Sequence, residues 1–124
     1  MCKILLVKKN IDELKNKIKE TKCFFFDLDG TLIDTEKVYF KYWKIASKLY
    51  GYELSDEEAL NVRSLDGRIG KAFIEEISGG ILDYTSVRNK RIEMMNEYFL
   101  THPIEVKPYA IEFLELLRRS NKKI

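Results

Sequence analysis

The sequence predicts an α/β protein in which helices predominate, and two patterns support this prediction. Residues 22–28 form an apolar run that ends in acidic side chains, which is typical of a buried strand leading into a loop at the edge of a parallel sheet. Residues 36–102 instead repeat apolar side chains at helical spacing. We therefore expect a small sheet portion and a larger helical portion.

The first 20 residues predict a strand followed by a helix. The apolar run Ile4 to Val7 indicates a short strand. Asn10 is a good helix N-cap, and Glu13 follows it at the spacing of a capping box. The apolar face of this helix consists of Ile11, Leu14 and Ile18. Together with the strand at 22–28, these elements predict a β-α-β unit with parallel strands and a right-handed crossover.

Four helices are predicted in the middle of the chain. They are Glu36–Tyr50, a helix opened by the capping box at 55–58, a helix from Asp66 or Gly67 to about Ser78, and Tyr84–Leu100. Gly51 is the expected stop of the first helix, and Pro103 breaks the pattern after the last. The aromatic side chains of the first helix recur at helical spacing, which is typical of a core, although some could face a substrate cleft. They are Tyr39, Tyr42, Trp43 and Tyr50.

Composition excludes several classes of protein. A net charge of +2 is too small to indicate a nucleic-acid or membrane partner, and no apolar run approaches the length of a transmembrane helix. Cys2 and Cys23 form no motif, and the first residues carry no export signal, so we expect a reduced, cytoplasmic protein. With 124 residues, 45% of them hydrophobic, one domain can form a real core.

The most informative segment is 23–36, which reads Cys-Phe-Phe-Phe-Asp-Leu-Asp-Gly-Thr-Leu-Ile-Asp-Thr-Glu. It places Asp27 and Asp29 two residues apart, directly after the predicted strand. Two acids are hard to explain by packing there, because buried carboxylates are costly unless they are paired or bind a metal ion. A strand ending at a helix-capping residue would explain Asp34 or Thr35 alone, but not the whole segment.

This segment closely resembles motif I of the haloacid dehalogenase (HAD) superfamily of phosphotransferases. The resemblance implies that Asp27 is the nucleophile that takes the phosphoryl group and that Asp29 is the general acid–base. It also implies a Mg²⁺ ion held by the Asp27 carboxylate and the Asp29 backbone carbonyl, which would screen the repulsion between carboxylate and phosphate. Dehalogenase members lack the second acid, so its presence favours phosphoryl transfer over carbon–halogen cleavage.

The resemblance covers residues 22–124 and implies a Rossmann-like core with an inserted helical cap, similar to that of the β-phosphoglucomutase-like phosphatases. Residues 1–35 would then be the N-terminal part of the core, with an extra strand and helix at 1–20 that have no family role. Residues 36–103 would form the cap, and 104–124 would return to the core. There Pro108 suits the first turn of a helix, while Tyr109 stands where the family usually has Gly.

Three further residues are candidates for binding the substrate. In the resembling enzymes the loop between the second and third cap helices faces the catalytic aspartate, and Arg68 fits that position best and Arg63 next. A guanidinium suits phosphate or carboxylate, although a solvated surface charge explains Arg68 equally well. Glu36 would support the dipole of its helix, and the family places an acid here near the entrance of the active site.

Two functions remain open. One is a Mg²⁺-dependent phosphatase or sugar-phosphate mutase that acts on a small phosphorylated metabolite through an aspartyl-phosphate at Asp27. The other is a non-catalytic, truncated homologue that acts in binding or assembly. The resemblance places further phosphate and metal ligands beyond Ile124, so we expect impaired activity of this chain alone, and either a homodimer or a missing C-terminal half as its partner. The sequence does not identify the substrate.

Overall fold

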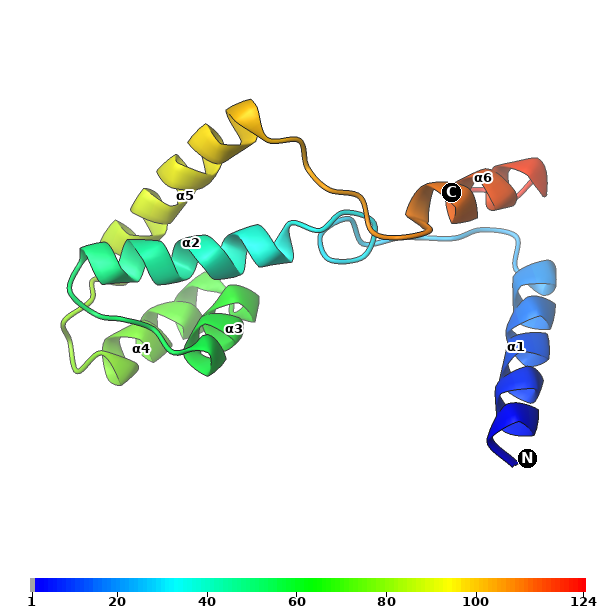
Figure 1. Ribbon diagram of the computed structural model, residues 1–124, viewed down its shortest axis with the longest axis horizontal. Coiled ribbons are helices and arrows are strands. Elements are labelled where there is room, and N and C mark those ends of the chain that lie inside the picture. Colours follow the sequence, from blue (N-terminus) through cyan, green and yellow to red (C-terminus); the bar gives the residue numbers. More distant parts are fainter. Residues whose placement is uncertain (1) are drawn as a thin grey trace. The chain divides into compact units, whose positions relative to one another are not determined.

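The computed structural model describes residues 2–124, and their side chains from residue 10 onward. Its helices, coloured along the sequence in Figure 1, are α1 (Cys2–Glu20), α2 (Glu36–Leu49), α3 (Asp56–Ser64), α4 (Gly67–Ile77), α5 (Tyr84–Thr101) and α6 (Ala110–Arg119). The chain forms two compact units. One consists of the residues up to Asp27 together with Pro108–Ile124, and the other is Leu28–Lys107.

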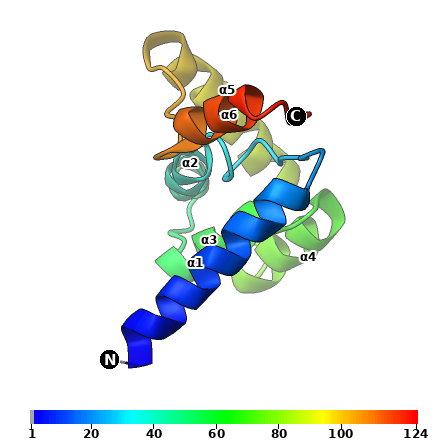
Figure 2. The same cartoon turned by 90° about the vertical axis from the view of Figure 1, so that its right-hand side faces the viewer.

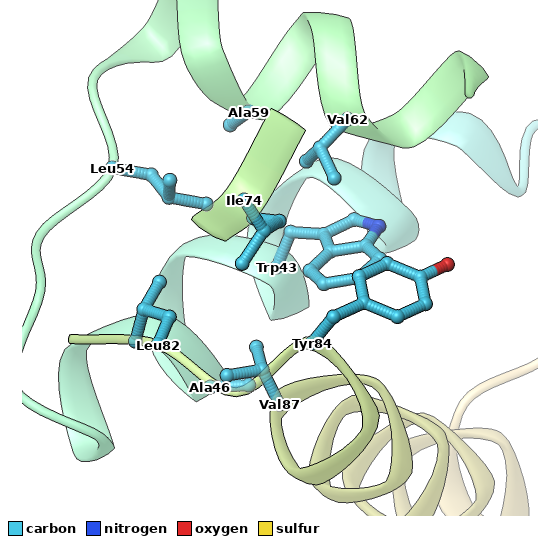
Figure 3. Packing of buried hydrophobic residues seen from close by; sticks show 9 residues of the cluster. All are labelled: Trp43, Ala46, Leu54, Ala59, Val62, Ile74, Leu82, Tyr84 and Val87. Carbon is cyan, nitrogen blue, oxygen red and sulfur yellow. The ribbon is translucent and has the colours of Figure 1, made fainter. Parts of the chain in front are cut away.

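The larger unit is a group of four helices built around α2. Helix α2 packs against α5 and α3, and α4 contacts both α3 and α5 (Figure 2). Their apolar faces share one core, shown in Figure 3, which consists of Trp43, Ala46, Leu54, Ala59, Val62, Ile74, Leu82, Tyr84 and Val87. The prediction of a predominantly helical chain is therefore confirmed, and the helical repeat of apolar residues forms a true core.

The predicted helix ends are confirmed by their caps. The Ser55 hydroxyl accepts from the backbone N–H of Glu58, and the Glu58 carboxylate accepts from the backbone N–H of Ser55, which completes the capping box of α3. Asp66 caps α4 and Asp83 caps α5 in the same way, through their side-chain oxygens. Gly51 follows the end of α2 with φ of 98°, a backbone conformation that favours glycine.

The aromatic side chains of α2 divide between core and surface. Trp43 is buried and stacks on Tyr84 with ring centres 5.8 Å apart, as predicted for a core residue. Tyr39 and Tyr42 are half-buried. Tyr50 is 44% exposed because it lies at the C-cap, beyond the last turn that faces the other helices.

The predicted strand at Ile4 to Val7 is wrong, because these residues lie inside α1. Residues 2–20 contain no Gly or Pro and are rich in Lys and Leu, which favour a helix once it has started. A short apolar run within such a segment adds to one continuous helix. The predicted β-α-β unit is consequently not formed.

The predicted strand at 22–28 is reduced to one parallel bridge between Cys23 and Lys123. The backbone N–H of Phe24 donates to the Lys123 carbonyl at 2.8 Å, and Phe24 packs on Phe113 of α6. Phe26 packs on the same ring, whereas Phe25 between them is 94% exposed. Side chains of an extended segment alternate between two faces, and only one face is covered here. The expected buried strand is therefore wrong, because one face of the segment is exposed, and a Rossmann-like sheet is not seen among the described residues.

The turn before α6 differs from the predicted one. Helix α6 begins at Ala110, so Pro108 precedes its first turn and does not form part of it. Tyr109 occupies the N-cap position with φ of 65°, in the left-handed region that usually selects glycine. The substitution of Tyr for the family's Gly therefore leaves the backbone of this turn strained. None of the helices in the described part of the chain is long and apolar enough to cross a membrane.

Candidate active site

The motif residues that follow Asp27 form a tight loop at the start of the helical unit. The backbone N–H groups of Leu32 and Ile33 both donate to the Leu28 carbonyl, at 3.0 and 3.1 Å, and the N–H of Gly30 donates to the Ile33 carbonyl at 2.9 Å. Gly30 has φ of 76°, and a Cβ atom there would lie 2.7 Å from the Glu36 carboxyl group. The loop therefore requires glycine at this position, which explains why Gly30 follows Asp29 in the motif.

The returning chain after α5 fixes this loop from its other side. The backbone N–H of Asp34 donates to the Glu105 carbonyl at 2.7 Å, and the N–H of Lys107 donates to the Leu32 carbonyl at 2.9 Å. Side chains repeat the connection, since Lys107 Nζ lies 3.2 Å from Asp34 Oδ1 and Lys37 pairs with both Asp34 and Glu105. The hydrogen bond with Glu105 raises the pKa of Lys37. The motif loop, at the start of the helical unit, is thus bonded to the segment at the end of that unit.

A buried hydroxyl group orients Asp29. Thr35 is 5% exposed, and its Oγ1 donates to Asp29 Oδ1 at 2.7 Å. Thr35 also occupies the N-cap position of α2, but its side chain makes no capping hydrogen bond. A threonine at this position would ordinarily accept from a backbone N–H of the first turn. Its hydroxyl is committed to the carboxylate instead, which indicates that it positions Asp29 rather than stabilising the helix start.

Asp29 lies at the edge of a cavity of about 360 Å³ within the helical unit. The cavity is also lined by Thr35, Glu36, Tyr39 and Arg63. Arg63 Nη2 lies 3.8 Å from Glu36 Oε2, so the charged ends of these two predicted substrate-binding residues meet there. The cavity combines carboxylates, one guanidinium and an aromatic ring, which suits a small polar ligand that carries negative charge.

The other predicted site residues lie elsewhere. Arg68 is exposed in the first turn of α4, and it does not line the cavity that contains Asp29. Asp27 is exposed and belongs to the smaller unit, at the end of the extended segment that begins at Cys23. The structure therefore brings Asp29, Glu36 and Arg63 together, and the roles of all five residues stay predictions.

The oxygen atoms of the motif fit a magnesium ion only in part. Asp27 and Asp29 supply the hard oxygen donors that Mg²⁺ prefers. Among the described residues, however, no group of three or more His, Cys, Asp or Glu side chains is arranged to hold a metal ion. The described residues thus offer part of a Mg²⁺ site.

Sequence reasoning missed two contributors to this site. The local pattern predicts Thr35 only as part of the motif or as a helix cap, although a Thr six residues after Asp29 is within reach of it once the loop closes on itself. The sequence places Lys107 only at the start of the returning segment. Its pairing with Asp34 spans more than 70 residues of sequence, so no local pattern could have shown it.

Comparison with known proteins agrees with the motif. The family model for haloacid dehalogenase-like hydrolases matches residues 21–124, which is most of the chain. This chain belongs to the haloacid dehalogenase-like hydrolases. The match begins at the extended segment before Asp27 and includes all the helices from α2 onward.

The chain is also similar to an uncharacterized protein of Haemophilus influenzae. The two are 34% identical over 68 residues, a segment that covers 55% of this chain and 30% of the relative. This chain therefore aligns with less than a third of the length of that curated relative.

Proposed function

We propose that this chain supplies the nucleophile and the general acid–base of a Mg²⁺-dependent phosphoryl-transfer hydrolase that acts on a small phosphorylated metabolite. Membership of the haloacid dehalogenase-like hydrolases supports the class of reaction. The hydrogen bond from buried Thr35 to Asp29 carries the proposal, because it fixes the orientation of the second motif carboxylate on an otherwise exposed loop. The acid, the glutamate and the arginine around one cavity support a small anionic substrate.

The proposed reaction proceeds in two steps. In the first, a carboxylate oxygen of Asp27 attacks phosphorus, the bond from phosphorus to the leaving oxygen breaks, and Asp29 gives its proton to that oxygen. In the second, Asp29 takes a proton from water, the water oxygen attacks phosphorus, and the bond to Asp27 breaks. Thr35 donates to Oδ1 of Asp29, so Oδ2 is the atom that would carry the transferred proton. Bound Mg²⁺ would supply charge neutralisation between phosphate and carboxylate.

Within this proposal the helical unit acts as a cap of the type found in β-phosphoglucomutase-like phosphatases, and phosphatase and mutase activity are both consistent with the residues. The second candidate is a non-catalytic binding or assembly role. It is favoured by one observation, the incomplete set of metal ligands among the described residues.

The proposal is tested with Asp27→Asn and Asp29→Asn, assayed on p-nitrophenyl phosphate with Mg²⁺. Each substitution keeps the size of the side chain, and removal of the nucleophile should lower turnover by about 10³-fold or more. Asp12→Asn on α1 makes the same chemical change at an exposed position and should leave turnover unchanged.

A second measurement does not depend on turnover. The chain is incubated with acetyl phosphate and Mg²⁺, quenched in acid and analysed by mass spectrometry, which should locate a phosphoryl adduct on Asp27. Equal turnover in Asp27→Asn and the wild type, with no adduct on either protein, would favour the binding role instead.

A further inference from the structure

A second cavity in the helical unit combines aromatic walls with three arginine side chains. It has a volume of about 390 Å³ and is lined by residues that include Tyr39, Trp43, Arg63, Tyr84, Arg88 and Arg91. Figure 3 shows the rings of Trp43 and Tyr84 side by side where α2 meets α5. None of the described residues that line this cavity is acidic. Its size is that of a small-molecule site.

Arg91 is the least expected residue of this cavity. It is only 6% exposed, and its guanidinium carbon lies 4.7 Å from the ring centre of Tyr39 and 4.8 Å from that of Trp43. Nη1 lies 3.7 Å from the Sδ atom of Met95, and Nε has no hydrogen-bond partner in the part of the chain that the structure describes. Burial lowers the pKa of Arg91, and hydrogen bonding and charge interaction with Tyr39 oppose that effect.

The described residues offer Arg91 no carboxylate as an ion-pair partner. Burying a cation without an anion costs desolvation free energy, and the cation–π contacts with the two rings offset only part of it. A bound anion would offset more of this desolvation free energy. The buried guanidinium, which has no carboxylate partner among the described residues, therefore indicates a ligand that carries negative charge.

The two neighbouring arginines strengthen this indication. The Nε atom of Arg63 is also buried without a partner, and its ion pair with Glu36 is long, at 3.8 Å. Arg88 is exposed at the cavity, one turn before Arg91 on α5. Gly67 and Thr85 also line the cavity, and they lie in the first turns of α4 and α5, where the helix dipoles are positive.

This cavity adjoins the one that contains Asp29, because Tyr39 and Arg63 line both. We propose that it binds the oxyanion group, phosphate or carboxylate, that the metabolite carries in addition to the transferred phosphoryl group. Arginine forks match both groups geometrically, and the aromatic walls would pack against the carbon skeleton between them. That this anion is part of the substrate rests on the proposed function, whereas the binding of an oxyanion by the three arginines does not.

Trp43 provides the readout, because it is the only tryptophan of the chain and lines the cavity. The wild-type chain is titrated with inorganic phosphate and, separately, with succinate, at constant ionic strength, and the fluorescence of Trp43 is followed. We expect a saturable change with at least one of them. Saturation by phosphate alone identifies a phosphate site, and saturation by succinate identifies a carboxylate site. A fluorescence change that does not saturate with either anion overturns the proposal.

Arg88→Ala and Arg118→Ala are the matched variants. Both remove one exposed arginine, but only Arg88 lines the cavity. The apparent Kd should rise about tenfold or more in Arg88→Ala, since hydrogen bonds to charged groups are worth about that much. It should stay unchanged in Arg118→Ala, which lies on α6 and lines neither cavity. An equal weakening in both variants would show that the anion responds to net charge only, which refutes a defined site.

Two additional variants separate this proposal from the proposed function. Arg91→Lys keeps the charge but removes the planar fork, and it should weaken binding while circular dichroism shows an unchanged helix content. Asp27→Asn should bind the anion as tightly as the wild type, even though it is inactive under the proposed function. Loss of anion binding in Asp27→Asn would place the anion at the transfer site and would overturn the assignment to this cavity.

Discussion

The hydrogen bond from Thr35 to Asp29 leads to the most specific prediction about the site. Thr35→Val keeps the shape of a buried, β-branched side chain and removes only the hydroxyl that donates to Asp29 Oδ1 at 2.7 Å. Because Thr35 makes no capping hydrogen bond, the start of α2 should survive the change. The effect should therefore fall on the position of Asp29 and only weakly on folding.

The magnitude follows from the type of hydrogen bond. A hydrogen bond to a charged group contributes about 1.5–3 kcal/mol, and we take the lower end because Asp29 is exposed. Lost in the transition state, about 1.5 kcal/mol lowers kcat/KM roughly tenfold. The free energy of unfolding should fall by about 0.5–1.5 kcal/mol, because valine keeps the shape of the side chain but loses the net contribution of one hydrogen bond.

Two measurements check this prediction. Steady-state hydrolysis of p-nitrophenyl phosphate with Mg²⁺ gives kcat/KM, and urea unfolding gives stability. Thr35→Ser keeps the hydroxyl and should retain most of the activity, and Thr31→Val makes the same chemical change at an exposed position of the same loop. If Thr35→Val is as active as the wild type, or if Thr35→Ser is equally impaired, the hydroxyl does not position Asp29.

Two further predictions concern stability. Gly30→Ala should destabilise the chain by about 1–2 kcal/mol, because the positive φ of Gly30 is unfavourable for a residue with a Cβ atom. Gly67→Ala is the control, because a Cβ atom there meets open space, and it should be neutral or slightly stabilising. Thermal unfolding compares the two variants, and equal melting temperatures would refute the strain at Gly30. Hydrogen bonds from the hydroxyl and the backbone of Ser86 lower the pKa of Asp83 below its usual 3.8, so the contribution of this cap to stability is present above that value and is lost as the pH falls through the lowered pKa. The melting temperatures of the wild type and Asp83→Asn should therefore converge as the pH falls from 6 towards about 3, with a smaller pH dependence in Ser86→Ala, and a constant difference across this range would contradict the role of the ionised cap.

The helices of the larger unit could be predicted because their signals are local. Ser55 and Glu58 are three residues apart, and the side chain of each accepts a hydrogen bond from the backbone N–H of the other. Asp66 and Asp83 cap the next two helices through their side-chain oxygens. Capping depends on a few adjacent residues, so it can be read from the chain without knowledge of the packing. The motif at 23–36 is local as well, and the family it indicated is the one to which the chain belongs.

The N-terminal residues could not be assigned in the same way. An apolar run such as Ile4 to Val7 fits a strand or a buried turn of helix equally well. It forms part of α1 because the sequence around it favours a helix without interruption. The burial of Phe25 likewise depended on neighbouring strands, and in the described residues only Lys123 pairs with this segment. A strand exists only through its partners, which a local pattern does not contain.

The sequence by itself determined the family, the two acidic motif residues and the ends of the middle helices, because each of these depends on residues close together in the chain. Only the tertiary structure decided which side chains meet. It joined Thr35 to Asp29 across a closed loop, Lys107 to Asp34 across most of the chain, and Arg91 to the rings of Tyr39 and Trp43 across two helices. Contacts of this kind depend on how helices pack and how loops close. They cannot be predicted from the sequence, because many distant pairs of residues are compatible with one local pattern.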